Sequence, residues 1–173
     1  MLIVKGVDEV DKLSVRPADG DIEKVVKTHS NMLFKLCFVI LCNNSDAEDA
    51  VSETFIRYIT KVQHFTDEEH KKAWLIRVAT NICKDMHRFR KRNNYINIDD
   101  LTNYCSNQKE FEILDDVIKL PNKYKVVIHL FYIEGCKTNE ISQILSISPS
   151  AVRKRLQYGR ERLKMEHGKD DLL

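Results

Sequence analysis

Residues 138–164 read TNEISQILSISPSAVRKRLQYGRERLK and are the most informative stretch for the fold. Apolar residues at spacings of three and four predict a short helix capped by Thr138, a tight turn over 146–149, and a longer helix that begins at Pro149. Ser148 is the expected cap of the longer helix. The expected buried stripe of that helix consists of Val152, Leu156, Gly159 and Leu163. A short helix, a tight turn and a longer helix form a helix-turn-helix motif.

The outward face of the longer helix has the residue types that read DNA. The second helix of such a motif lies in a major groove about 12 Å wide, where long side chains reach base edges. Arg153 and Lys154 lie near the start of the helix, where base contacts are expected, and Gln157 one turn later can pair with adenine. The alternative is an ordinary helical hairpin with a basic solvent face.

The N-terminal part of the chain has three amphipathic helical patterns that can close one core. The first runs from Asp21 to the pair Asn43 and Asn44. Capping-box spacings at Ser45 and Thr66 predict the starts of the second and third helices. These three patterns predict a small helical domain.

A polar, aperiodic and Asn-rich stretch separates this part from the helix-turn-helix. Residues 93–111 are typical of a flexible acidic linker, and residues 1–20 are expected to form a leader because they show no sustained period. A helix that starts at Pro121 and ends at Gly135 follows the linker. No strand pattern occurs, so the sequence predicts an all-α fold of two small helical domains joined by a flexible linker. The two predicted domains are residues 21–92 and 112–167.

The composition supports helices, and its charges are unevenly distributed. Among 173 residues there are only 5 Gly and 3 Pro, which leaves little material for hairpin turns, and 28 Lys and Arg nearly balance 26 Asp and Glu. Residues 84–92 contain five basic residues and one acidic residue, residues 93–120 six acidic and two basic, and residues 150–164 six basic and one acidic. The chain therefore has two basic patches that could bind a polyanion, although solvated helix faces would have the same pattern.

No set of residues suggests catalysis or a cofactor. The five cysteines form no C-x-x-C pair, the six histidines are scattered, and neither a phosphate-binding loop nor a G-x-S-x-G motif occurs. A metal held by His64 and His70 with Glu68 or Glu69 is a weak alternative. The longest apolar run, residues 36–42, is far shorter than the roughly 20 residues that span a bilayer. We therefore expect a reduced, cytoplasmic, non-enzymatic protein with no cofactor, no metal and no membrane insertion.

Three motifs, in order along the chain, resemble one family. Residues 46–55, DAEDAVSETF, closely resemble the D-A-E-D-L-V-Q-E-T-F signature in region 2 of the extracytoplasmic-function (group 4) sigma factors of bacterial RNA polymerase. Residues 73–81, AWLIRVATN, look like the family's A-W-L-x-R-I-A-x-N, and residues 120–156 are similar to region 4. The resemblance implies a sigma factor that binds core polymerase, recognises the minus-ten and minus-thirty-five promoter elements and promotes DNA opening.

The resemblance also assigns roles to individual residues. The expected contacts to the clamp helices of the largest polymerase subunit are Asp46, Asp49, Glu53 and Arg57. The expected minus-ten DNA-binding residues are His70, Lys71, Lys72, Arg77, Asn81, Lys84 and Arg88. The expected minus-thirty-five DNA-binding residues are Ser150, Arg153, Lys154, Arg155, Gln157, Tyr158 and Arg160. Members of this family are commonly held inactive by an anti-sigma factor, which is a further expected partner beside polymerase and double- and single-stranded promoter DNA.

The chain departs from the family pattern at a few positions. Ser146 stands where the turn usually has Gly, and Ala151 replaces a Thr that could contact phosphate. Tyr158 stands where Arg is common, which suggests an altered promoter preference. Two alternatives remain at this stage: a stand-alone helix-turn-helix regulator whose residues 21–92 form a dimerisation or sensor domain, and a helical scaffold that does not bind DNA.

Overall fold

The structure is a computed structural model, and it describes residues 19–61, 65–89 and 105–167. Within those residues the chain forms helices and no strand, which confirms the all-α prediction. Residues 1–18 of the predicted leader, residues 93–104 of the predicted linker and the candidate metal residue His64 lie outside the described residues. In chain order the helices are α1 (Asp19–Leu41), α2 (Asn44–Thr60), α3 (Glu68–Phe89), α4 (Gln108–Lys119), α5 (Asn122–Ile128), the π-helical segment η2 (His129–Ile133), α6 (Thr138–Leu145) and α7 (Pro149–His167).

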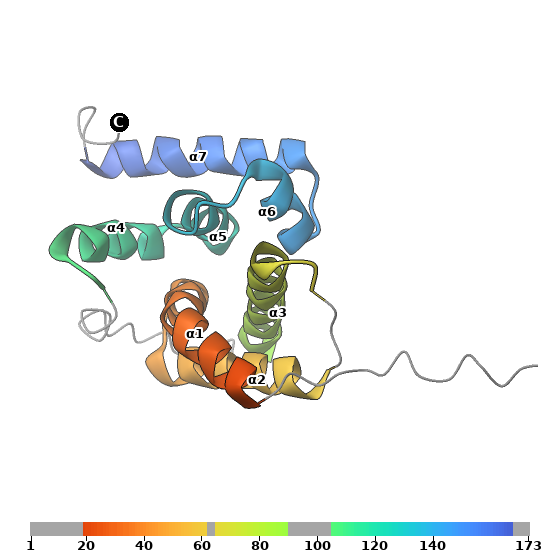
Figure 1. The fold of residues 1–173 in the computed structure, drawn as a ribbon. Helices are drawn as coiled ribbons and strands as arrows, with labels where there is room; N and C mark the ends of the chain where they lie inside the picture. Colours follow the sequence, from red (N-terminus) through yellow and green to blue (C-terminus); the bar gives the residue numbers. More distant parts are fainter. Residues whose placement is uncertain (1–18, 62–64, 90–104, 168–173) are drawn as a thin grey trace, which may run out of the picture.

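Helices α1, α2 and α3 pack on one another and form an N-terminal unit, residues 19–89 (Figure 1). Its core contains fully buried side chains from α1 and α3, such as Leu33, Phe38, Leu75 and Ile76. Trp74 is half-buried against the rings of Tyr58 and Phe65, as the helical period predicts. One apolar stripe from each helix therefore closes this core, as expected from the sequence.

The caps of α2 and α3 differ from the predicted ones. The backbone N–H of Asp46 donates to Oδ1 of Asn43 (2.9 Å), so Asn43 and not Ser45 caps α2. The backbone N–H of His70 donates to Oδ1 of Asp67 (2.7 Å), one residue after the predicted Thr66. A cap residue must lie just outside the helix with its oxygen near the third helical amide, and Asn43, with φ −150°, meets this condition.

The helices after the linker form a C-terminal unit, residues 105–167, in which α5, α6 and α7 pack together. Pro121, predicted as the first residue of the helix, is instead the N-cap of α5, which starts one position later at Asn122. Gly135 has the left-handed φ of +69° expected where the helix ends. Lys137 and not Thr138 is the N-cap of α6, and the Glu140 carboxylate accepts from its backbone N–H (2.7 Å). The start of α4 lies inside the predicted linker, whose last residues are therefore helical.

The helix-turn-helix is formed by α6 and α7. Ser148 caps α7 as predicted, because its Oγ accepts from the backbone N–H of Ala151 (3.2 Å). All four residues of the predicted buried stripe of α7 are buried. At Gly159 an added Cβ would lie 2.7 Å from Cγ1 of Ile128, so glycine permits the close approach of α7 to α5. In the turn, Ser146 adopts φ 54°, a left-handed conformation that glycine would adopt with less strain.

The N-terminal and C-terminal units also contact each other. Helix α6 packs against α3, and α1 contacts α4, α5 and η2 (Figure 1). The two units thus form one arrangement with a shared interface, which we call the closed arrangement.

Candidate nucleic-acid and polymerase interfaces

The predicted minus-thirty-five readers lie on the exposed face of α7. Ser150, Arg153, Lys154, Gln157, Tyr158 and Arg160 are all exposed. The ammonium of Lys154 lies 5.9 Å from the centre of the Tyr158 ring, and Gln157 donates to the carboxylate of Glu161 (3.0 Å). Both contacts are at the surface, so these side chains can turn toward a ligand at little cost.

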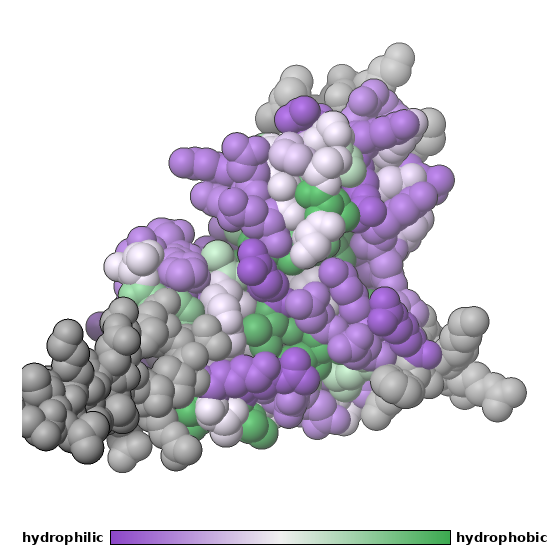
Figure 2. Space-filling view, turned by 90° about the vertical axis from the view of Figure 1, so that its right-hand side faces the viewer, coloured by the Kyte–Doolittle hydropathy of each residue, from purple (hydrophilic) through white to green (hydrophobic). Residues whose placement is uncertain are grey.

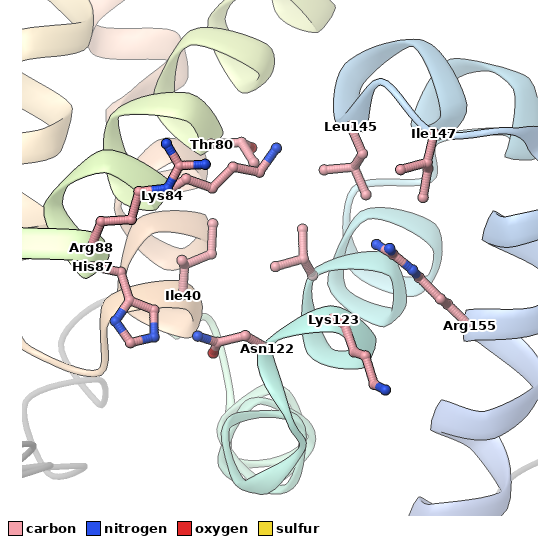
Figure 3. A pocket seen from close by; sticks show the side chains of 11 residues that line it. Ile40, Thr80, Lys84, His87, Arg88, Asn122, Lys123, Leu145, Ile147 and Arg155 are labelled. Atoms are coloured by element: carbon pink, nitrogen blue, oxygen red, sulfur yellow. The ribbon is translucent and has the colours of Figure 1, made fainter. Parts of the chain in front are cut away.

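Arg155 differs from the other predicted readers because it is half-buried and lies between the units. It lines a cavity of about 530 Å³ together with Lys84 and Arg88 of α3 (Figure 3). Burial, followed by the positive charges of Arg155 and Arg88, lowers the pKa of Lys84 below its usual value. Apolar side chains complete this cavity, including Ile40, Leu145 and Ile147.

Four of the predicted minus-ten residues follow one line on α3. Arg77, Asn81, Lys84 and Arg88 are exposed, and their spacings of four, three and four place them on one helix face. Asp85 forms an exposed ion pair with Arg88 (3.7 Å). We call Arg77, Asn81, Lys84 and Arg88 the α3 stripe.

The remaining predicted minus-ten residues lie in the first turn of α3. His70 is exposed, with its ring 5.6 Å from that of Phe65. Lys71 pairs with Glu68 (2.7 Å), and this hydrogen bond raises the pKa of Lys71. Lys72 instead turns to the C-terminal unit, where it donates to the backbone carbonyl of Glu134 (3.2 Å) and pairs with its carboxylate (3.6 Å).

The predicted polymerase-binding row on α2 is only partly exposed. Asp49 is exposed, and Glu53 forms an ion pair with Arg57 (2.8 Å). Asp46 is only 6% exposed, so the prediction that it belongs to an exposed acidic row is wrong. It lies in the first turn of α2, where its backbone is held by the cap and its side chain turns inward.

The sequence analysis missed one exposed apolar residue beside this row. Ile56 on α2 is 53% exposed and lies three residues after Glu53, so the two share a helix face. An exposed Ile beside acidic side chains suits a protein partner better than DNA. In the sequence, Ile56 falls outside the three- and four-residue spacing of the buried apolar residues of α2, and this could have identified it as exposed.

The surface of the molecule has polar and apolar areas side by side. Figure 2 shows hydrophobic side chains in the middle of one face, bordered by hydrophilic ones. No helix in the described part of the chain is long and apolar enough to cross a membrane. Among the same residues, no group of three or more His, Cys, Asp or Glu side chains could hold a metal ion.

Two helical units, one of them a helix-turn-helix with an exposed basic face on α7, are typical of a DNA-binding protein. The family models for Sigma-70 region 2 and Sigma-70 region 4 match residues 25–93 and 112–163. The ECF RNA polymerase sigma factor SigW of Bacillus subtilis (strain 168) is 30% identical, over 96% of this chain and 97% of SigW. The chain belongs to the extracytoplasmic-function sigma factors of RNA polymerase, as the motifs predicted.

Other relatives agree with this assignment. The ECF RNA polymerase sigma factor SigE of Mycolicibacterium smegmatis (strain ATCC 700084 / mc(2)155) is 28% identical over 93% of this chain and 69% of SigE. The sigma factor RpoE from Bartonella quintana, solved with the anti-sigma factor NepR, has the same fold, with a TM-score of 0.68 at 18% identity over 86% of this chain and 99% of that one. CnrH, solved with the cytosolic domain of CnrY, has a TM-score of 0.66 at 22% identity over 89% and 92% of the two chains.

Proposed function

We propose that this sigma factor reads the minus-thirty-five element with the exposed face of α7 and holds the unpaired minus-ten strand along the α3 stripe. The observation that carries the proposal is that the two units each expose one cationic helix face. On α7, Arg153 and Lys154 lie near the helix start, where side chains of a recognition helix reach base edges. On α3, Arg77 and Lys84 flank Asn81, a combination of phosphate-binding cations and an amide that can bind a base.

Core polymerase is the proposed partner of α2. Asp49 and Glu53 offer negative charge to a basic protein surface, and Ile56 adds apolar area beside them. The proposed set is therefore Asp49, Glu53, Ile56 and Arg57, without Asp46 as a direct contact.

The protein acts in the cytoplasm with polymerase, and its role requires neither catalysis nor a cofactor of its own. Because RpoE was solved with an anti-sigma factor, we include an anti-sigma factor among the proposed partners of this chain.

Run-off transcription with purified core polymerase tests the proposal. A promoter-specific transcript is expected only when the chain is added. A chain that binds duplex DNA alone and yields no such transcript would instead be a stand-alone regulator. A log–log salt slope of duplex binding near −4 to −5, from about four to six neutralised phosphates on α7, is expected, and a flat salt response would contradict DNA binding by α7.

A further inference from the structure

The cavity that Lys84 and Arg155 line combines cationic and apolar side chains. Its volume of about 530 Å³ is in the range of sites that enclose a small ligand. Figure 3 shows the side chains of Lys84 and Arg155 extending toward each other from α3 and α7. Thr80 lies one helical turn before Lys84 and also lines the cavity. The apolar residues that line it are all aliphatic: Ile40, Val126, Leu145 and Ile147.

The positive charge in this cavity has no counter-charge beside it. No Asp or Glu is among the described residues that line the cavity, and neither Lys84 nor Arg155 forms an ion pair with a described residue. Arg88 lines it as well, and its ion pair with Asp85 is exposed. Burial, followed by Arg155 and Arg88, lowers the pKa of Lys84, as expected for cations that are close together and partly desolvated. A negatively charged ligand would relieve this repulsion.

Thr80 adds a hydrogen-bond donor without a partner. The residue is fully buried, and its Oγ1 has no hydrogen-bond partner among the described residues. A helical Thr can donate to the carbonyl four residues earlier, as Thr54 does to Ala50 (2.7 Å). A buried hydroxyl that lacks such a bond is destabilising. Because Thr80 lines the cavity, an oxygen atom of a bound ligand can accept its hydrogen bond.

These features together define the chemistry of a ligand. Cations alone would suit any polyanion, whereas the aliphatic side chains stabilise a ligand that buries a hydrocarbon chain. A phosphate monoester carries a charge of about −1.5 to −2, more than a carboxylate, and therefore matches a group of several cations better. Arginine also binds phosphate through two parallel hydrogen bonds. An alkyl phosphate meets all of these conditions.

We propose that the cavity between α3 and α7 binds a small anionic amphiphile, a phosphate monoester with a single alkyl chain. Its phosphate group lies between Lys84 and Arg155 and accepts a hydrogen bond from Thr80. Its alkyl chain packs on Ile40 and Ile147. This binding site adds a small-molecule ligand to the DNA and polymerase of the proposed function, and it requires neither of them.

The first test uses octyl phosphate as the probe and the full-length chain labelled at its isoleucine δ1 methyl groups. Titration below the critical micelle concentration should shift the NMR signals of Ile40 and Ile147 with one-to-one saturation. Ile56 and Ile113 are exposed and lie outside the cavity, so their signals should not move. By calorimetry, inorganic phosphate and octyltrimethylammonium should each bind at least ~10-fold more weakly, since one lacks the chain and the other has the opposite charge. Octanoate should bind more weakly than octyl phosphate.

The second test uses two pairs of variants in the full-length chain. Arg155→Gln and Thr80→Val should each weaken octyl phosphate binding at least ~10-fold, because each removes a hydrogen bond to a charged group. Arg162→Gln is the control for charge on an exposed part of α7, and Thr54→Val is the control for a buried hydroxyl of the same unit. Thr80→Val should leave the thermal midpoint of the free chain unchanged or raise it, because the lost hydroxyl had no partner.

Equal affinity for octyl phosphate and octyltrimethylammonium would overturn the proposal, as would equal shifts at Ile56 and Ile147, because either result indicates adsorption of the alkyl chain alone. Unchanged octyl phosphate affinity in both Arg155→Gln and Thr80→Val would also overturn it. All of these measurements use the free chain without DNA or polymerase. Failure of run-off transcription therefore rejects the proposed function and not the ligand site, and failure of octyl phosphate binding rejects only the ligand site.

Discussion

The helices α7 and α3 are both basic, yet they differ in how much of their charge is available. On α7, Arg153, Lys154 and Gln157 all face solvent. On α3, Lys72 is paired with the other unit and Lys84 shares a cavity with Arg155. The density of basic residues in the sequence therefore does not measure the available binding surface. In the closed arrangement the α7 face proposed to bind duplex DNA is exposed to solvent. Part of the α3 surface proposed to bind single-stranded DNA is in contact with the other unit.

The largest effects are expected from substitutions in the cores of the two units, because each should impair the DNA-binding helix of one unit more than that of the other. Leu156→Ala removes a buried anchor of α7, and Leu75→Ala removes one of α3. Each change should cost ~2–5 kcal/mol of unfolding free energy. Leu156→Ala should impair duplex binding more than single-strand binding, and Leu75→Ala should do the reverse, as measured by fluorescence anisotropy with both DNA forms. Equal losses of both activities in both variants would show that the units do not work separately.

Arg153→Ala tests the reading face of α7 directly. It should cost ~1–3 kcal/mol of binding to a minus-thirty-five duplex and relax sequence preference at one base pair. Arg162→Ala is the matched control, since nine residues are about two and a half helical turns and place Arg162 on the opposite side of α7. An unchanged ranking of promoter variants with Arg153→Ala would contradict its role as a base reader.

Charge reversal on α2 should affect polymerase and leave both DNA-binding helices intact. Glu53→Lys should weaken core polymerase binding by on the order of 1 kcal/mol, because it places a positive charge against a basic surface. The unfolding free energy should change by less than ~1 kcal/mol, since the Glu53–Arg57 pair is exposed. Glu23→Lys, on the exposed face of α1, is the control. Loss of duplex binding together with polymerase binding would indicate misfolding.

Much of each helix could be predicted from local sequence. The buried residues of a helix recur every three or four positions, and for this reason Val152, Leu156 and Leu163 were all correctly predicted to be buried. Helix starts were less predictable, because neighbouring residues such as Asn43 and Ser45 both have an oxygen that can cap. Only backbone geometry decides which of them lies just outside the helix.

The contacts between the units could not be predicted in this way. Lys72 and Glu134 are 62 residues apart and belong to motifs that each have a local explanation. The prediction that Asp46 is exposed was wrong for a related reason. Its charge suggested exposure, whereas in the structure this residue of the first turn of α2 is buried. The spacing of apolar residues along a helix predicts which of its own side chains are buried. It does not predict which charged side chains are covered by a second unit.

The smallest expected effect compares two paired cations of α3. Arg88 pairs with Asp85 on the surface, with side chains 80% and 61% exposed, whereas Lys72 pairs with the enclosed Glu134. Asp85→Asn should change the unfolding free energy by no more than ~0.5 kcal/mol, because exposed pairs contribute little. It should strengthen single-strand binding only through the removed negative charge, an effect that salt screens.

Glu134→Gln removes the same charge, and its gain in single-strand binding should persist at salt concentrations that abolish the gain from Asp85→Asn. The reason is that Glu134→Gln frees Lys72 from an enclosed pair, which salt screens weakly, whereas Asp85→Asn changes the field of an exposed pair, which salt screens strongly. Titration of a minus-ten oligonucleotide at two salt concentrations measures both variants. If the two gains fall equally with salt, then Lys72 and Arg88 are equally available in the free chain, and the difference between α7 and α3 would lie in their targets and not in the closed arrangement.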